Sequence, residues 1–145
     1  MSLCFGYVSE GGELYPKIPV RIRYRENGRP IHTTALLDSG SSVSFIQDDL
    51  ASIWGIKHTR KEPVKVDTIG PGVNCTEWDL WVEVEGLKRE DGTLEEHHKL
   101  KIPFYIPIAS KRKVGVILGR EGFFEKFDIL FKEKDLKIIL EYTGE

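Results

Sequence analysis

The sequence has few cysteines, no strong excess of charge of either sign and no long apolar run. Cys4 and Cys75 are the two cysteines; they stand far apart and form no CxxC pair, which argues against a disulfide scaffold or a thiolate zinc site. Lysine plus arginine is 21 and aspartate plus glutamate is 23, so the formal net charge of -2 excludes a nucleic-acid binder that works through bulk charge. No apolar segment approaches the ~20 residues of a membrane span, and the first residues lack the basic start of a signal peptide. We therefore expect a cytoplasmic protein with no membrane partner and no nucleic-acid partner.

The chain is long enough for one hydrophobic core and short for two ordinary domains. It has 145 residues, whereas a domain typically takes about 100–200. A hydrophobic fraction of 40% and a charged fraction of 30% are typical of a globular protein. We assign residues 16–145 to a single domain and expect residues 1–15 to be an N-terminal tail or an extra interface strand.

Alternating apolar and polar residues predict a chain made mostly of strands. The predicted strands cover residues 17–24, 31–37, 64–68, 78–84, 100–108, 114–119, 127–131 and 136–140. The pair Asn27-Gly28 is a tight-turn signal that joins the first two strands in a hairpin. Pro103 and Pro107 suggest an edge or a bend in the strand that contains them. This pattern predicts an all-β fold, a small closed barrel or a sandwich, with one or two short helices.

Two short helices and one charged loop interrupt the strands. Residues 47–55 favour a helix that Asp48 or Asp49 caps and Gly55 ends. Residues 120–126 favour a helical turn. Residues 87–100 are dense in charge, which predicts a solvated turn.

An acid follows directly on an apolar strand in the segment ALLDSG, residues 35–40. A carboxyl group at the end of a buried strand is held rigidly and is partly desolvated, so its pKa can shift. The glycine two residues after Asp38 allows a close approach of backbone and lets its own amide face the carboxylate. The same triplet is also a common turn, so its neighbours decide between the two interpretations.

Three motifs in sequence order resemble those of the retropepsin-like aspartic proteases. The segment Leu36–Gly40 matches the family signature of two apolar residues followed by Asp-Ser/Thr-Gly. The segment VILGR, residues 116–120, matches the second signature of apolar residues followed by glycine, often with arginine. Between them, IGPGV at residues 69–73 takes the place of a glycine-rich flap tip. The resemblance covers residues 17 to 131 of the chain.

The resemblance implies a small closed barrel-like aspartic protease lobe with a flap hairpin, acting on a polypeptide in extended conformation. In this family two aspartates about 3 Å apart share one proton; the ionised one activates a water and the other polarises the scissile carbonyl. The chain has a single such triplet, so the resemblance implies a homodimer in which Asp38 faces its own copy. No cofactor and no metal are implied.

The resemblance also assigns roles to the residues around Asp38. They are Ser39, Gly40 and Ser41 for support of the catalytic loop, with Ser39 bonding across the dimer axis; Ile69, Gly70, Pro71, Gly72 and Val73 for the flap; Leu36 and Val116 for the substrate pocket; and Ile117, Leu118, Gly119 and Arg120 for the second structural motif.

Several residues depart from the family pattern. Pro71 stiffens the flap tip and removes an amide donor. Ser42 stands where many retroviral members carry an acid that holds the arginine, so Arg120 needs another partner. A hydroxyl of Ser41 bonding to the Asp38 carboxylate would favour the charged form and lower its pKa, from which we expect an acidic pH optimum. The two closing strands are closer to cellular and prokaryotic single-lobe members than to viral ones.

Other functions remain open from the sequence. One alternative is a non-catalytic retropepsin-like module that binds peptides or proteins, and another is a structural barrel of a larger polyprotein. The adjacent His97 and His98 point in opposite directions on a strand, so no metal site is expected. A serine or Cys75 nucleophile would need a positioned histidine, and no motif supplies one. The basic turn at residues 111–113 has no interleaved aromatic residue and is interpreted as a solvated loop.

Overall fold

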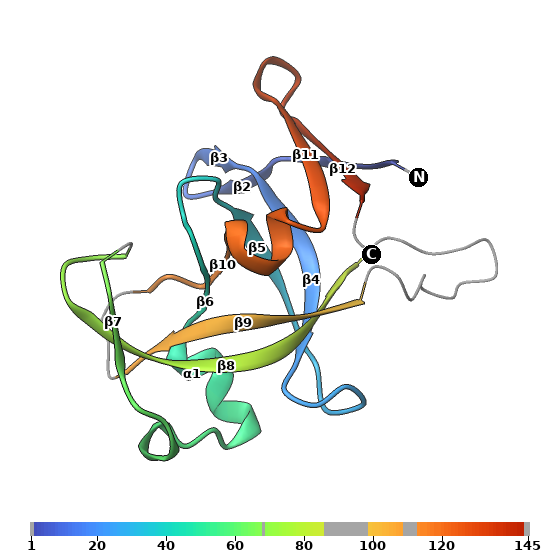
Figure 1. Cartoon of the computed structure of the whole chain (residues 1–145). Coiled ribbons are helices and arrows are strands. Elements are labelled where there is room, and N and C mark those ends of the chain that lie inside the picture. The colour runs from blue at the N-terminus through green and yellow to red at the C-terminus, as the bar shows by residue number, and fades with distance from the viewer. Residues whose placement is uncertain (1, 68, 86–98, 109–112, 144–145) are drawn as a thin grey trace.

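The computed structural model describes residues 2–67, 69–85, 99–108 and 113–143. Most of them lie in strands, and short helical turns connect these strands (Figure 1). The strands are β1 (Ser2–Gly6), β2 (Val8–Glu10), β3 (Glu13–Tyr15), β4 (Lys17–Arg23), β5 (Ile31–Leu37), β6 (Ser44–Ile46), β7 (Val64–Val66), β8 (Val73–Val84), β9 (Lys99–Pro107), β10 (Val116–Leu118), β11 (Phe127–Lys132) and β12 (Lys137–Tyr142). The helical turns are α1 (Asp48–Ala51), η1 (Ser52–Trp54), η2 (His58–Arg60), η4 (Arg120–Phe124) and η5 (Glu133–Asp135).

Six of these strands close a barrel. Their order is β4-β5-β10-β6-β9-β8, and β4 pairs back onto β8 with Val20 opposite Val84. Strand β7 pairs only with β8 and extends this hairpin away from the closed ring. The closed barrel confirms the all-β fold class.

The barrel closes around side chains that the sequence alternation directs inward. On β4 the side chains of Ile18, Val20 and Ile22 are fully buried while their neighbours are partly exposed. Strand β8 repeats the pattern, with Leu80 and Val82 inside and Trp81 on the other face. Because successive side chains of a strand point to opposite faces, one face of each strand builds the core.

The expectation of an edge at Pro103 and Pro107 is wrong, because β9 lies inside the barrel between β6 and β8. The amide of Ile108 donates to the carbonyl of Asn74 at 2.9 Å, so even-numbered residues of β9 direct their amides at β8. The two prolines occupy odd positions, so their missing N–H groups leave the hydrogen bonds between β9 and β8 intact. On the other side, β6 pairs only with Phe104 and Tyr105.

The N-cap of the first short helix lies one residue before the predicted caps. Gln47, not Asp48 or Asp49, is its N-cap, and no side chain bonds to the free amides there. Gly55 ends the helical stretch in the left-handed region at φ 68°, as predicted. Among the described helices, none is long and apolar enough to cross a membrane.

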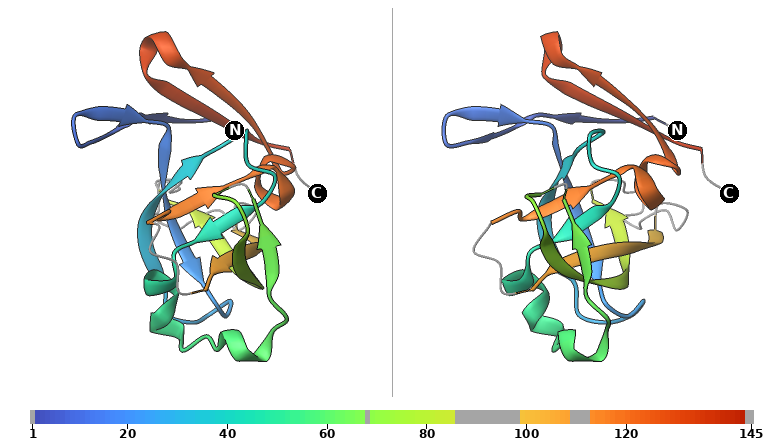
Figure 2. Two further views of the ribbon diagram at one scale, coloured as in Figure 1. Left: turned by 90° about the vertical axis from the view of Figure 1, so that its left-hand side faces the viewer. Right: turned by 60° about the vertical axis from the view of Figure 1, so that its left-hand side comes forward.

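A second, three-stranded sheet lies beside the barrel, with the order β1-β12-β11. The first strand, near the N-terminus, pairs antiparallel with β12 near the C-terminus, and β2 and β3 form a hairpin of their own (Figures 1 and 2). Residues 2–6 and most of 8–15 are therefore ordered strands, and a role of β1 at an interface stays a prediction. Most of the predicted charged turn, with His97 and His98, falls on residues 86–98, and residues 111 and 112 of the predicted basic turn fall on 109–112. Both ranges lie outside the described residues.

Truncating a core side chain of β10 should destabilise the whole barrel. Leu118 is fully buried between β5 and β6, so we expect Leu118→Ala to lower the free energy of unfolding by about 2–5 kcal/mol. Leu14→Ala is the matched control, because that leucine is 47% exposed and such a change typically costs within about 0.5 kcal/mol. Urea denaturation followed by tryptophan fluorescence measures both, and equal midpoints for the two variants would contradict the assigned core.

Candidate active site

The two family-like motifs, far apart in sequence, are neighbours in the barrel. Strand β10 lies parallel to β5, with Ile117 opposite Leu36 and Leu118 opposite Leu37. Its other edge pairs antiparallel with β6. The amide of Asp38 donates to the carbonyl of Leu118 at 3.1 Å, so the acid emerges where the β5 ladder ends. The loop of residues 38–43 leaves β5 and returns as β6, with β10 between them.

Backbone amides orient the Asp38 carboxylate. The amide of Gly40 donates to Asp38 Oδ1 at 2.9 Å, and the amide of Ser41 donates to the Asp38 carbonyl at 3.1 Å. Asp38 is partly exposed, and no described cation forms an ion pair with it. The side chain is thus aimed by the turn while remaining open to a ligand or a second acid.

The hydroxyl of Ser41 does not bond to Asp38. It is fully buried and donates to the carbonyl of Val43 at 2.7 Å, which closes the loop internally. The expected bond between the Ser41 hydroxyl and the Asp38 carboxylate is therefore wrong. The expectation of an acidic pH optimum rested on that bond and loses its support. Ser39 is exposed at the same turn and forms no hydrogen bond with the described residues.

Backbone contacts hold the second motif under this loop. The amide of Gly119 donates to Ser44 Oγ at 3.0 Å, and the amide of Arg120 donates to the carbonyl of Ser41 at 2.9 Å. A Cβ at Gly119 would overlap the Val43 carbonyl and lie 2.7 Å from the Ser41 carbonyl oxygen. Only glycine allows this approach. The sequence reasoning missed Ser44, whose buried hydroxyl no motif marks.

The Arg120 side chain has no ionic partner in the described part of the chain. Its side chain is exposed, whereas its backbone is bonded into the loop. The second motif is therefore held by its backbone rather than by an arginine–acid pair.

The hairpin β7–β8 has the glycine tip that the sequence predicted. Strands β7 and β8 pair from Val64 opposite Cys75 to Val66 opposite Val73. Asp67 organises the tip, because its carbonyl accepts the Gly70 amide at 3.2 Å and its Oδ1 accepts the Gly72 amide at 2.8 Å. The sequence reasoning passed over Asp67, although an Asp before a Gly-Pro-Gly turn is a signal of such bonding.

The tip of this hairpin and the loop of residues 38–43 lie on the same side of the barrel in every view (Figures 1 and 2). Ile69 and Val73 at the tip are partly buried, and Pro71 is exposed. Function as a flap over the acid stays a prediction.

The two predicted pocket residues differ in burial. Leu36 is partly exposed next to Asp38, whereas Val116 is 3% exposed and packs in the core. Ile117, opposite Leu36, is partly exposed on the same side. The surface beside Asp38 is therefore formed by Leu36 and Ile117 rather than by Val116.

Thr76 and Cys75, two side chains that could act as nucleophiles, are both buried in the core. His58 bonds to Asp48 Oδ1 at 2.7 Å and to Thr76 Oγ1 at 2.6 Å, but Thr76 is fully buried and cannot meet a substrate. This trio pins η2 to α1 and β8. Burial raises the pKa of the Cys75 thiol to about 11, the opposite of what a thiolate nucleophile needs. No group of three metal-ligating side chains lies together among the described residues.

Comparisons with known proteins identify the fold. No family model matches the sequence, and no curated protein matches it. A retropepsin-like aspartic protease from Rickettsia conorii has a similar structure, with a TM-score of 0.64 and 15% identity over 100% of this chain and 94% of that one. An aspartic proteinase from Irpex lacteus matches with a TM-score of 0.56 and 13% identity, over 99% of this chain and 47% of that one. EIAV protease complexed with the inhibitor HBY-793 matches at 0.47, with 20% identity over 78% and 88% of the two chains. The chain has the retropepsin-like aspartic protease fold.

A side chain at position 119 should disrupt the loop that carries Asp38. Gly119→Ala drives a Cβ into the backbone of residues 41–43, which cannot give way as a flexible side chain can. We expect a loss of at least about 3 kcal/mol in the free energy of unfolding, the upper end for overpacking. Gly6→Ala is the control, because nothing lies within 4 Å of a Cβ there. Thermal unfolding by circular dichroism measures both, and a Gly119→Ala protein as stable as the control would refute the close approach.

Proposed function

We propose that the protein is an aspartic endopeptidase whose active site forms between two copies of the chain. The observation that carries this proposal is the Asp38 carboxylate, oriented by the Gly40 amide and unpaired with any described cation, at a strand end of a retropepsin-like barrel. A carboxylate in that state can accept a proton from water or share one with a second acid.

One copy of the chain supplies half of the proposed catalytic pair. Two carboxylates facing each other cannot both ionise comfortably, so one proton is shared between them. The other described acids lie outside any Asp-Ser-Gly turn, so the second carboxylate is assigned to Asp38 of another copy. The match to only 47% of the Irpex lacteus proteinase supports this, since two such chains are needed to make up the length of that protein.

The proposed reaction uses the pair on an extended peptide. The ionised carboxylate removes a proton from a bound water while the protonated one polarises the scissile carbonyl and then passes its proton to the leaving amine. The peptide lies against Leu36 and Ile117, and the β7–β8 tip covers it to exclude bulk water. The prearranged turn at Asp67 keeps this tip in shape before the peptide arrives.

Removing the ionisable group of Asp38 should abolish cleavage without unfolding the protein. We expect Asp38→Asn to lower the rate of hydrolysis of an unfolded protein substrate by at least about 100-fold, because general acid–base catalysis is worth roughly 10²–10⁴. Asparagine still accepts the Gly40 amide, so the melting temperature should change little. Asp135→Asn, an exposed acid in η5, is the control. Hydrolysis by the Asp38→Asn protein at the wild-type rate would contradict the proposal.

Mixing the two proteins tests whether the site is shared. Subunits of wild type and Asp38→Asn, mixed in equal amounts and allowed to exchange, should retain about one quarter of the activity of the same total amount of wild type. Independent sites would retain about one half. Sedimentation velocity on the same samples gives the oligomeric state. A strict monomer that binds peptide without cutting it would favour the non-catalytic binding module.

A further inference from the structure

A basic and aromatic groove lies at the end of the barrel remote from Asp38. It consists of two adjoining cavities of about 380 and 490 Å³, which share Tyr24, Arg25, Lys61 and Trp78 in their walls. Both volumes fall within the roughly 300–1,000 Å³ of small-molecule sites. Tyr24 follows β4, whose end pairs with the start of β5, and Asp38 follows the other end of β5. The length of β5 separates the two, roughly 20 Å at about 3.3 Å per residue.

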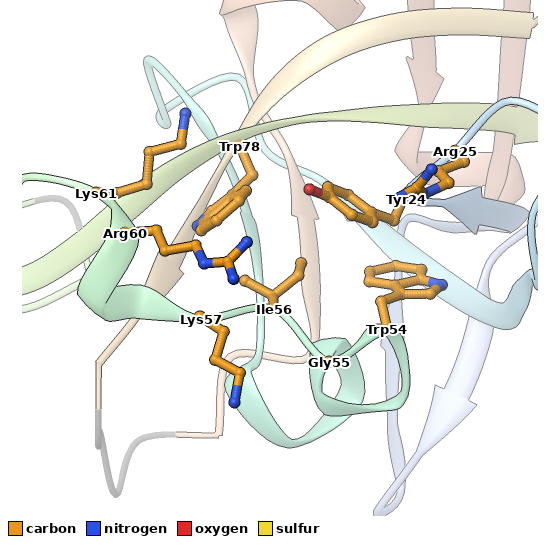
Figure 3. A pocket seen from close by; sticks show the side chains of 9 residues that line it. All are labelled: Tyr24, Arg25, Trp54, Gly55, Ile56, Lys57, Arg60, Lys61 and Trp78. Atoms are coloured by element: carbon orange, nitrogen blue, oxygen red, sulfur yellow. The ribbon is translucent and has the colours of Figure 1, made fainter.

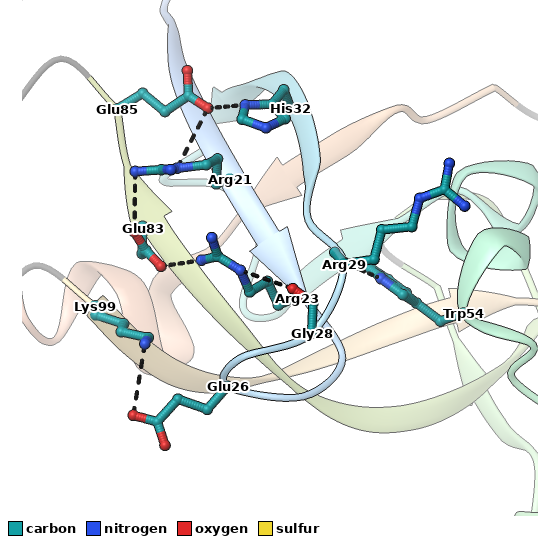
Figure 4. Close-up of polar contacts among 10 residues, drawn as sticks. All are labelled: Arg21, Arg23, Glu26, Gly28, Arg29, His32, Trp54, Glu83, Glu85 and Lys99. Atoms are coloured by element: carbon teal, nitrogen blue, oxygen red, sulfur yellow. Dashed lines mark hydrogen bonds and ion pairs between the residues drawn. The ribbon is translucent and has the colours of Figure 1, made fainter.

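Aromatic rings form much of the groove wall. They are Tyr24, Trp54, Trp78 and Trp81. Tyr24 and Trp78 meet edge to face with their centroids 6.0 Å apart. Trp54 lies in the wall of the same cavity (Figure 3). A hydrogen bond from its Nε1 to the Arg29 carbonyl at 2.8 Å fixes its ring (Figure 4). Trp78 is buried at 8% exposed, whereas Tyr24, Trp54 and Trp81 are partly exposed. These three rings offer a surface for stacking against a planar ligand.

Cations surround these rings and have no acidic partners among the described residues. They are Arg25, Lys57, Arg60, Lys61 and Lys101. None forms an ion pair with a described carboxylate, and Asp79 is the one acid among the described residues of the walls. Lys61 lies 4.9 Å from the centroid of Trp78, and Lys101 lies 5.8 Å from that of Trp81.

The neighbouring cations on the same barrel face are neutralised. Arg23 pairs with Glu83, Arg21 pairs with Glu83 at 3.3 Å, and Lys99 pairs with Glu26 at 3.6 Å (Figure 4). Among the described residues, positive charge is thus left without acidic partners at the groove and is balanced beside it. A concave surface of this kind attracts an anion.

The groove is also built to hold its shape. Three of its cations lie on or next to η2, and His58 in that turn bonds to both Asp48 and Thr76. The Thr76 hydroxyl in turn accepts the Nε1 proton of Trp78 at 2.7 Å. One network therefore fixes both the basic turn and an aromatic wall of the groove.

We propose that this groove binds a nucleotide unit, a phosphate joined to a planar base, either free or within a single strand. Lysine and arginine side chains would contact the phosphate, and the tyrosine and tryptophan rings would stack on the base. An acidic peptide would satisfy the charges but would leave the rings without a planar partner. This site is independent of Asp38 and of the proposed protease.

The test measures the affinity of the full chain for a fluorescein-labelled single strand of roughly 12 nucleotides, by anisotropy at several salt concentrations. The double variant Arg60→Gln/Lys61→Gln should bind roughly tenfold more weakly at low salt and should lower the log–log salt slope by about 1.4, since each phosphate contact on a single strand contributes about 0.7. Tyr24→Leu should weaken binding about fivefold and leave the slope unchanged, because stacking releases no counterions.

The control Lys132→Gln/Lys134→Gln removes the same charge from the β11–β12 end and should bind as wild type. Competition by adenosine monophosphate would identify a free nucleotide as the ligand, and competition only by an unlabelled strand would identify a single strand. Two outcomes overturn the proposal: equal binding by Arg60→Gln/Lys61→Gln and the control, or equal competition by an acidic peptide of the same charge.

Discussion

The close approach of Gly119 to the backbone of residues 41–43 is the constraint on which the rest of the site depends. It brings β10 between β5 and β6, where the Gly119 amide donates to Ser44 Oγ of β6 and the amides of Arg120 and Glu121 donate to carbonyls of the loop. That loop then directs Asp38 by the Gly40 amide alone. Because these contacts use backbone or a buried serine, Asp38 is positioned without a charged partner from the described part of the chain.

Local patterns in the sequence predicted most strands of the barrel and the hairpins β4–β5 and β7–β8, but they predicted neither β6 nor the N-terminal hairpin β2–β3. Alternation on β4 and β8 identifies the inward faces, and the β7–β8 tip follows from two glycines around a proline. Two further expectations, the Ser41 bond to Asp38 and the edge position of the β9 prolines, were wrong because they depend on the three-dimensional arrangement of the strands. The Ser41 hydroxyl could have bonded to Asp38 or within its own loop, and the sequence does not distinguish the two; in the structure it donates to the Val43 carbonyl. The prolines of β9 lie in an interior strand because their missing amides face away from β8.

In the candidate site, too, residues in contiguous motifs could be predicted from the sequence, whereas residues that act through contacts with other segments could not. Asp38 and Gly119 are visible in the sequence because their motifs are short and contiguous. Ser44 and Asp67 act through single hydrogen bonds that no motif requires. The groove is harder still to foresee, because its cations come from the β4–β5 loop, the η2 turn and β9. A net charge of -2 averages over the whole chain and hides a local excess of positive charge.

Strand β5 connects two regions with different needs for a partner. At one end, Asp38 would be half of the proposed catalytic pair, so the proposed protease needs a second copy. At the other end, the groove has its rings and cations within one chain. In a twofold dimer with Asp38 on the axis, the two grooves would face outward, one on each subunit and roughly 20 Å from the axis. A ligand there would leave the peptide cleft open and could tether the dimer near its substrate.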